Sequence, residues 1–322
     1  MNGSVVALDF AAESDREEFA RAAVSGLSVC PRAIPAKFLY DARGSALFDA
    51  ICELPEYYVT RTETAILRRV APEIARLAGP NCALVEFGSG SSVKSRLLLD
   101  AMPGLAVYAP IDISRVHLDA TAARLRSDYP ALAIAPVCAD YMALPSLPQL
   151  GSPVSRRLGF FPGSTIGNLE PAEAKAFLRH ARDLLGDNGA LVVGVDLKKD
   201  AGVLHAAYND SAGVTAAFTL NLLRRMNREL DATFDLAAFE HDASYNAEQG
   251  RIEIYFRSLR PQAVTVAGYR FFFAGGERVH TEYSYKYAPA DFPALIDDTG
   301  FTLAQTWTDE QELFAVLYLT AG

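Results

Sequence analysis

The sequence of 322 residues is poor in the residues that build disulfide frameworks and metal sites. It has four cysteines, and no two of them have the spacing Cys-x-x-Cys. Its five histidines are isolated, without a pair at helical spacing. We therefore expect buried thiols, and neither a disulfide scaffold nor a bound metal.

Basic residues and long hydrophobic runs are also lacking. Lysine and arginine number 30 against 39 acidic residues, which gives a net charge of -9. Proteins that bind nucleic acid or anionic membranes through bulk electrostatics need the opposite balance. No segment approaches the length of a membrane span, and the first ten residues do not form a signal peptide. We expect a cytoplasmic globular protein without nucleic-acid or membrane partners, large enough for one big domain or two modest ones.

The most informative stretch is Leu-Val-Glu-Phe-Gly-Ser-Gly-Ser-Ser-Val-Lys-Ser-Arg, residues 84–96. It predicts a strand, a tight turn and the start of a helix. Gly88 and Gly90 would let a ligand approach the backbone, and amides at a helix start offer unpaired donors. We interpret the stretch as a nucleotide-type cofactor loop, with an ordinary strand-to-helix turn as the alternative.

Strands and helices alternate after this point. We expect strands at 83–87, 106–111, 133–138, 157–161 and 190–195, and helices at 94–101, 115–128 and 171–185. The alternation predicts a parallel sheet with helices on both faces and ligands at the carboxyl ends of its strands. Asp112 at the second strand end could accept both hydroxyls of a ribose, and Asp140-Tyr141 after the third could bind an adenine. Each alone also suits a helix cap or a turn.

The pattern differs on both sides of this alternation. Before it we expect helices at 13–27 and 44–52, and one that Thr60 or Thr62 caps and that runs to Leu77. After it we expect helices at 198–208 and 212–227, antiparallel strands at 251–259, 263–273 and 280–287, a helix at 289–300, and strands at 301–307 and 313–320. The last two strands would complete the first sheet antiparallel, as in methyltransferase sheets. Residues between the two parts would then form an insertion.

Two cofactors suit such a site, a nicotinamide dinucleotide and S-adenosylmethionine. The dinucleotide fingerprint needs a third glycine, but Val93 stands three residues after Gly90. We also expect the carboxylate of Glu86 to repel a pyrophosphate. These two features favour S-adenosylmethionine.

Five blocks of the sequence closely resemble the L-histidine Nα-methyltransferase family of ergothioneine biosynthesis. Besides the Gly-rich loop they are Leu-Pro-Glu-Tyr-Tyr at 54–58, Gly-Ser-Thr-Ile-Gly-Asn-Leu at 163–169, Tyr-Asn-Asp-Ser-Ala-Gly-Val-Thr at 208–215 and Thr-Glu-Tyr-Ser at 281–284. The resemblance runs essentially end to end. It implies a Rossmann-like class I methyltransferase sheet with an inserted α+β substrate-binding domain, and trimethylation of the α-amino group of L-histidine to hercynine.

We also expect a monomer with the following domain limits. Residues 1–60 would pack with the substrate domain, 61–196 would bind S-adenosylmethionine, 197–287 would bind the substrate, and 288–322 would return to the sheet.

Roles follow from the resemblance residue by residue. The donor would be held by Gly88, Lys94, Asp112, Asp140, Tyr141 and Gly163. Asn168 and Tyr208 would hold the backbone end of the amino acid, and Tyr57, Glu282 and Ser284 its imidazole. Tyr40 is a further candidate for this pocket. So is Ile254, which stands where mycobacterial members carry methionine.

The chemistry of these residues agrees with those roles. An amide such as that of Asn168 can contact a carboxylate and an amine at once, and the hydroxyl of Tyr208 can donate to a carboxylate. Glu282 and Ser284 are two residues apart on an expected strand and so share a face, where they suit a ring N–H. An outward-facing pair on an edge strand is the alternative. Competing functions are methylation of another aromatic amino acid, a dinucleotide-dependent oxidoreductase and a silent amino-acid-binding module.

Overall fold

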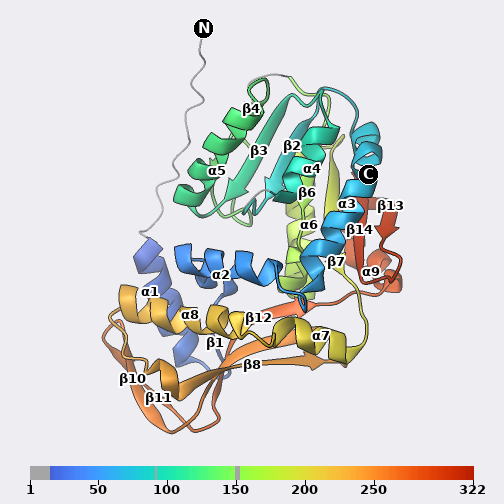
Figure 1. The fold of residues 1–322 in the computed structure, drawn as a ribbon. Helices are drawn as coiled ribbons and strands as arrows, with labels where there is room; N and C mark the ends of the chain where they lie inside the picture. The colour runs from blue at the N-terminus through green and yellow to red at the C-terminus, as the bar shows by residue number, and fades with distance from the viewer. Residues whose placement is uncertain (1–14, 91–92, 149–152) are drawn as a thin grey trace. The chain divides into compact units, whose positions relative to one another are not determined.

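The computed structural model describes residues 15–90, 93–148 and 153–322 (Figure 1). Ser91 and Ser92 of the glycine-rich loop, and the first two residues of the helix expected at 13–27, lie outside the described residues. The chain forms two compact units. The first contains Val59–Lys198 and Lys286–Gly322, and the second contains Ala11–Tyr58, described from Asp15, and Lys199–Tyr285.

A mixed sheet forms the centre of the first unit. Its strands are β2 (Ala83–Phe87), β3 (Val107–Asp112), β4 (Ala133–Ile134), β5 (Val137–Cys138), β6 (Arg157–Phe161), β7 (Ala190–Asp196), β13 (Phe301–Thr308) and β14 (Phe314–Ala321). They follow the order β13-β14-β7-β6-β2-β3-β4, and β5 also pairs with β3. The pairs from β4 to β7 are parallel, whereas β14 is antiparallel to both of its neighbours. The predicted Rossmann-like class I methyltransferase sheet is confirmed.

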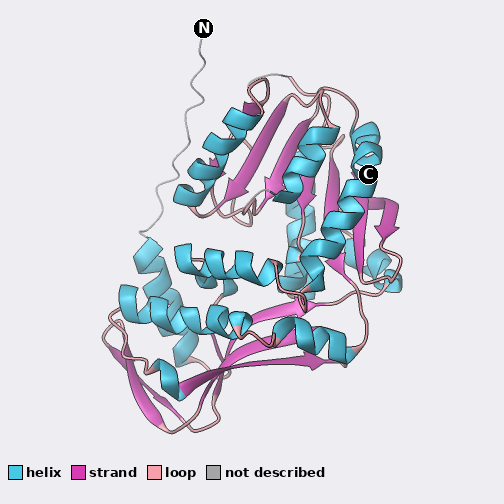
Figure 2. Ribbon diagram, viewed as in Figure 1, coloured by secondary structure: helices cyan, strands magenta, loops and turns pink. Residues whose placement is uncertain are grey.

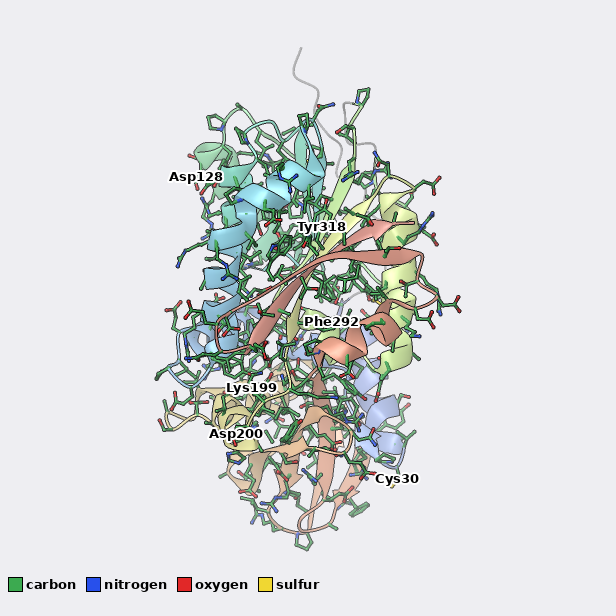
Figure 3. All side chains as sticks on the ribbon, turned by 90° about the vertical axis from the view of Figure 1, so that its right-hand side faces the viewer. Cys30, Asp128, Lys199, Asp200, Phe292 and Tyr318 are labelled. Atoms are coloured by element: carbon green, nitrogen blue, oxygen red, sulfur yellow. The ribbon has the colours of Figure 1, made fainter. Side chains whose placement is uncertain are left out.

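Helices cover both faces of this sheet (Figure 2). They are α3 (Tyr58–Ala78), α4 (Val93–Ala101), α5 (Arg115–Asp128), α6 (Pro171–Leu185) and α9 (Phe292–Ile296). The apolar side of α6 and α9 packs on alternate strand residues that include Val193 and Val195. Gly194, between them, faces α3 on the opposite side, as the strand period of two requires. Figure 3 labels two fully buried members of this unit, Phe292 of α9 and Tyr318 of β14.

The second unit combines helices with a sheet whose strand pairs are antiparallel, except for one parallel pair at its edge. Its helices are α1 (Asp15–Ser28), α2 (Ala42–Cys52), α7 (Ala201–Tyr208) and α8 (Val214–Glu229). Its sheet has the order β1-β12-β9-β8, formed by β1 (Arg32–Ala33), β12 (Arg278–Tyr285), β9 (Arg251–Ser258) and β8 (Phe239–Asn246). A separate hairpin consists of β10 (Gln262–Val266) and β11 (Tyr269–Phe273). Among the described residues, short 3-10 helices lie at Ala36–Leu39 and Leu236–Ala238 in this unit, and at Thr165–Asn168 and Pro289–Asp291 in the first unit.

Several expected elements were wrong in detail. The single strand expected at 263–273 is the β10–β11 hairpin, because Ala267 and Gly268 both adopt positive φ and form its tight turn. Strand β8 was missed, since few of its residues are buried. The strand expected at 133–138 is divided into β4 and β5. Neither Thr60 nor Thr62 caps α3, which already begins at Tyr58.

None of the helices in the described residues combines the length and the apolarity that crossing a membrane requires.

Candidate active site

The glycine-rich loop after β2 is fastened to the end of β3. Both Gly88 and Gly90 have positive φ, 75° and 44°, which favours glycine at these positions. The Gly90 amide donates to Oδ2 of Asp112 at 3.2 Å, and the Ser114 amide donates to Oδ1 at 2.9 Å. The structure thus brings Gly88 and Asp112, two predicted donor residues, to one edge of the sheet, with the Asp112 carboxylate held by backbone amides.

Tyr141 lies beside the same loop. A Cβ built on Gly88 would be 3.7 Å from Cε1 of Tyr141, so the ring lies against the loop backbone. The ring also packs edge-on against Phe87, Phe161 and Phe177. Burial raises the pKa of Tyr141, which keeps its phenol neutral. Asp140 accepts the amide of Met142 at 2.9 Å and so turns the chain after β5.

Lys94 and Gly163 both contact Glu63, a residue that the sequence did not identify as part of the site. Glu63 of α3 is completely buried and accepts the Gly163 amide at 3.0 and 2.8 Å, one distance for each carboxylate oxygen. Its Oε2 also forms a short ion pair with the Lys94 ammonium. No sequence motif marks this buried glutamate of a helix, and only its contacts identify it as part of the site.

Glu86 does not play the part expected from the sequence. Its carboxyl is buried and accepts the hydroxyls of Ser95, at 2.6 Å, and of Tyr108. Burial raises its pKa to about 7. The group is therefore only partly charged at neutral pH and is directed into the unit, so the argument that it repels a pyrophosphate was wrong.

The second unit gathers three of the predicted substrate residues. Tyr208 of α7 and Ser284 of β12 share a hydrogen bond of 2.8 Å between their hydroxyl oxygens. The ring of Tyr57 meets the ring of Tyr208 edge-on, with centroids 6.1 Å apart. All three side chains are buried. The cluster therefore presents hydroxyl groups within aromatic walls.

Two further candidates lie on the β9–β12 pair. Glu282 is directly opposite Ile254, and Ser284 is directly opposite Ile252, in antiparallel register after a bulge between His280 and Glu282. Directly opposite residues project to the same face of a sheet. Glu282 is half-buried, whereas Ile254 is buried.

Tyr40 contacts the aromatic cluster of Tyr57 and Tyr208 through one intervening residue, Phe48. Its ring packs edge-on against Phe48 and Phe218, at 5.6 and 5.3 Å between centroids. Phe48 in turn packs against Tyr57 at 6.5 Å.

Asn168 belongs to the first unit, where it ends the 3-10 helix Thr165–Asn168. The segment that carries it is fixed to the end of β7, because the Asp196 amide donates to Oγ of Ser164 at 2.9 Å. Ser164 itself has a φ of 57°, an uncommon value for a residue with a side chain. The half-buried Asn168 is thus held by a well-anchored backbone.

His241 of β8 was also missed, because the strand that carries it was not recognised. Its Nε2 lies 2.9 Å from the carbonyl oxygen of Tyr208, and its Nδ1 lies 2.9 Å from Oγ1 of Thr219. A carbonyl can only accept, so Nε2 donates to it and, in the neutral ring, Nδ1 accepts from the threonine. Burial lowers the pKa of His241 and favours this neutral form.

The described residues contain no group of three or more histidine, cysteine or acidic side chains that could hold a metal ion. Their polar groups instead match the parts of S-adenosylmethionine. Carboxylates suit the ribose and the adenine amine, an ammonium suits the carboxylate of the methionine end, and glycines allow close approach.

Comparisons with known proteins agree with this chemistry. Residues 19–321 match the family model described as histidine-specific methyltransferase, SAM-dependent. Histidine N-alpha-methyltransferase of Mycolicibacterium smegmatis is 45% identical over 93% of this chain and 94% of its own, and that of Mycobacterium tuberculosis is 41% identical over 89% of both. Ergothioneine biosynthesis protein 1 of Neurospora crassa is 31% identical over 86% of this chain and 32% of its own. The chain belongs to the family of histidine-specific, S-adenosylmethionine-dependent methyltransferases.

Proposed function

We propose that this protein methylates the α-amino group of L-histidine three times, with S-adenosylmethionine as donor, and so forms hercynine. The observation that carries the choice of substrate is the hydrogen-bonded pair Tyr208 and Ser284, with Glu282 two residues away on the same strand. A carboxylate and a hydroxyl on one face suit the two nitrogens of an imidazole. A phenyl ring has no N–H group to donate to the carboxylate, so it would not form this hydrogen bond.

Donor binding is assigned to the first unit. In this proposal Asp112 holds the ribose, Asp140 and Tyr141 hold the adenine, and Gly88, Lys94 and Gly163 hold the methionine end. The support is that backbone amides fix Asp112 next to the Gly-rich loop and that Tyr141 packs on Gly88. Both features fix the backbone at Gly88 and Gly90, which lowers the entropic cost of binding.

Histidine binding is assigned to residues that offer matched polar groups. Asn168 and Tyr208 hold its backbone end, whereas Tyr57, Glu282 and Ser284 hold its imidazole. Tyr40 and Ile254 complete the apolar walls. His241 supports this arrangement, because its bond to the carbonyl oxygen of Tyr208 fixes the backbone that carries the tyrosine.

The donor supplies an activated methyl group, and the protein supplies alignment and exclusion of water. No covalent nucleophile is needed. The α-amino group of a free amino acid is mostly protonated at pH 7, and only its neutral form has the lone pair that attacks the methyl group. A proton must therefore leave the amine before each transfer, and we assign no general base to this step. A pocket that holds the carboxylate and the imidazole leaves the amine free to rotate between rounds.

We further propose that Val59–Lys198 with the C-terminal segment is the donor domain and that the second unit is the substrate domain. The protein is expected to act as a monomer in the cytoplasm. Sedimentation of the purified chain tests whether it is a monomer, and localisation of a tagged chain tests whether it is cytoplasmic.

The decisive experiment uses purified protein, S-adenosylmethionine and a panel of amino acids, with products weighed by mass spectrometry. Histidine should gain three methyl groups, while tryptophan, tyrosine and phenylalanine should gain none under the same conditions. Absence of methylated histidine, or preference for another aromatic amino acid, would refute the proposal.

A further inference from the structure

Glu63 connects two of the proposed donor residues that are distant in sequence. Its side chain is 1% exposed and that of Lys94 is 16% exposed. The carboxylate accepts the Gly163 amide and pairs with the Lys94 ammonium at the same time. Glu63 is therefore screened from solvent, whereas Lys94 stands at the boundary.

The central strand β7 leaves space for this carboxylate. A Cβ on Gly194 would lie 2.1 Å from Oε1 of Glu63 and 3.0 Å from its carboxyl carbon. Contacts under 3.0 Å are not tolerated, so any larger residue at 194 would displace the carboxylate. A glycine in the middle of a buried strand costs stability, which indicates that the space it provides is used.

We propose that Glu63 is a positioning residue for the methionine end of the donor. It acts through Lys94 and Gly163 and does not itself contact the ligand. The proposal rests on the function proposed above, in which these two residues hold that end.

The charges support this role. The amino-acid end of the donor is a zwitterion, with an ammonium and a carboxylate on one carbon. A lone cation at Lys94 would attract the carboxylate but repel the ammonium and the sulfonium. The Lys94–Glu63 pair carries a positive and a negative charge. The Glu63 carboxylate binds both the Lys94 ammonium and the Gly163 amide, so it fixes the distance between these two groups. Charge-assisted hydrogen bonds of this kind are among the strongest available to side chains.

The test compares two ligands by calorimetry. S-adenosylhomocysteine has the amino-acid end, whereas 5′-methylthioadenosine carries a methyl group on the sulfur in its place. Glu63→Gln should weaken S-adenosylhomocysteine by about tenfold or more, because the charge is lost, and should change 5′-methylthioadenosine less than about twofold. The matched control is Glu73→Gln on the same helix, whose carboxylate accepts Nε1 of Trp307 at 3.0 Å. It should leave both affinities unchanged.

Equal losses for both ligands would show a purely structural role and overturn the inference, and so would no loss for either. If Glu63→Gln does not fold, Glu63→Asp keeps the charge and withdraws the carboxylate by one carbon. It should show the same selectivity with a loss of about fivefold, and unchanged affinity for S-adenosylhomocysteine would overturn the inference. A wild-type protein that binds neither ligand would overturn the proposed function and this inference with it.

Discussion

Glu282 and Ile254 lie directly opposite each other in the antiparallel pairing of β12 and β9. An acid and a branched aliphatic residue therefore share one face of the sheet, beside the Tyr208–Ser284 hydrogen bond. The pair places a charge next to an inflexible apolar wall, because isoleucine has few rotamers. A compact ring with an N–H group matches this combination.

Replacement of Glu282 should affect the substrate and spare the donor. We expect Glu282→Ala to weaken histidine binding by about tenfold to a hundredfold, because the ring N–H loses a charged acceptor. Affinity for S-adenosylhomocysteine should stay within about twofold, and calorimetry measures both. The control is Glu253→Gln on β9, which binds Arg251 and Tyr255 and is adjacent to Ile254. Equal losses for both ligands, or no loss, would contradict the imidazole assignment.

Asp112 should show the opposite selectivity. Asp112→Asn removes the charge that we propose accepts two ribose hydroxyls, and it alters the acceptor for the Gly90 and Ser114 amides. We expect affinity for S-adenosylhomocysteine to fall by about a hundredfold. The exposed Asp119 of α5 provides the control, as Asp119→Asn. Donor affinity that survives the Asp112 change would remove the ribose role.

Glu86 should make folding sensitive to pH. Its pKa is 4.5 in a flexible chain and about 7 when buried, so between these values the folded protein holds a proton that the unfolded chain has released. The free energy of unfolding should therefore fall as pH rises through this range, by about 3 kcal/mol. Glu86→Gln keeps an acceptor for Ser95 and Tyr108 without the charge. In urea denaturation it should be more stable than wild type at about pH 8 and similar at about pH 4. An unchanged pH profile would show that the carboxyl is not the source.

His241 should contribute a dependence of the opposite sign. Burial lowers its pKa below the ordinary 6.5, so in acid the unfolded chain binds a proton at this residue that the folded protein does not bind. The free energy of unfolding should fall as pH drops below 6.5 and should be insensitive to this group above it. His241→Gln retains a donor for the Tyr208 carbonyl and should lose this part of the acid sensitivity. Identical slopes for variant and wild type between about pH 7.5 and pH 5.5 would contradict the prediction.

A second buried pair tests how the end of β7 is stabilised. Lys286 and Asp196 form an ion pair of 2.8 Å, and both side chains are fully buried. Lys286→Met removes the ammonium that neutralises the buried Asp196 carboxylate and should lower the free energy of unfolding by about 3–5 kcal/mol. The double change Asp196→Asn with Lys286→Met should recover most of this loss. Urea denaturation measures all three, and a double variant no more stable than the single one would contradict this account.

Regular elements with clear boundaries were predictable from the sequence. Helices 115–128 and 171–185 and strands 83–87 and 157–161 have the predicted limits. Helix α6 illustrates the reason, since Pro171 stands at its first turn and Gly186 follows its last residue. The antiparallel end of the sheet was also predicted, because helix and strand patterns follow one another clearly there.

Features that depend on long-range contacts were not predictable. The turn between β10 and β11 contains only Ala267 and Gly268, which do not interrupt an apolar pattern. Glu63 and His241 lie in stretches without a motif. Each contacts a residue distant in sequence, Gly163 at 100 positions from Glu63 and Tyr208 at 33 positions from His241, and only these contacts indicate a role. The proposed ligand roles came from family motifs, and the structure adds which of these side chains contact one another.

The space at Gly194 has a consequence for evolution. Gly194 and Glu63 depend on each other. A side chain at 194 would collide with the Glu63 carboxylate. Without that carboxylate, the glycine would leave a cavity in the sheet packing. Relatives in which 63 is apolar should therefore carry a larger residue at 194. Such exchanges would be passed on as linked pairs, and single steps between them would be disfavoured.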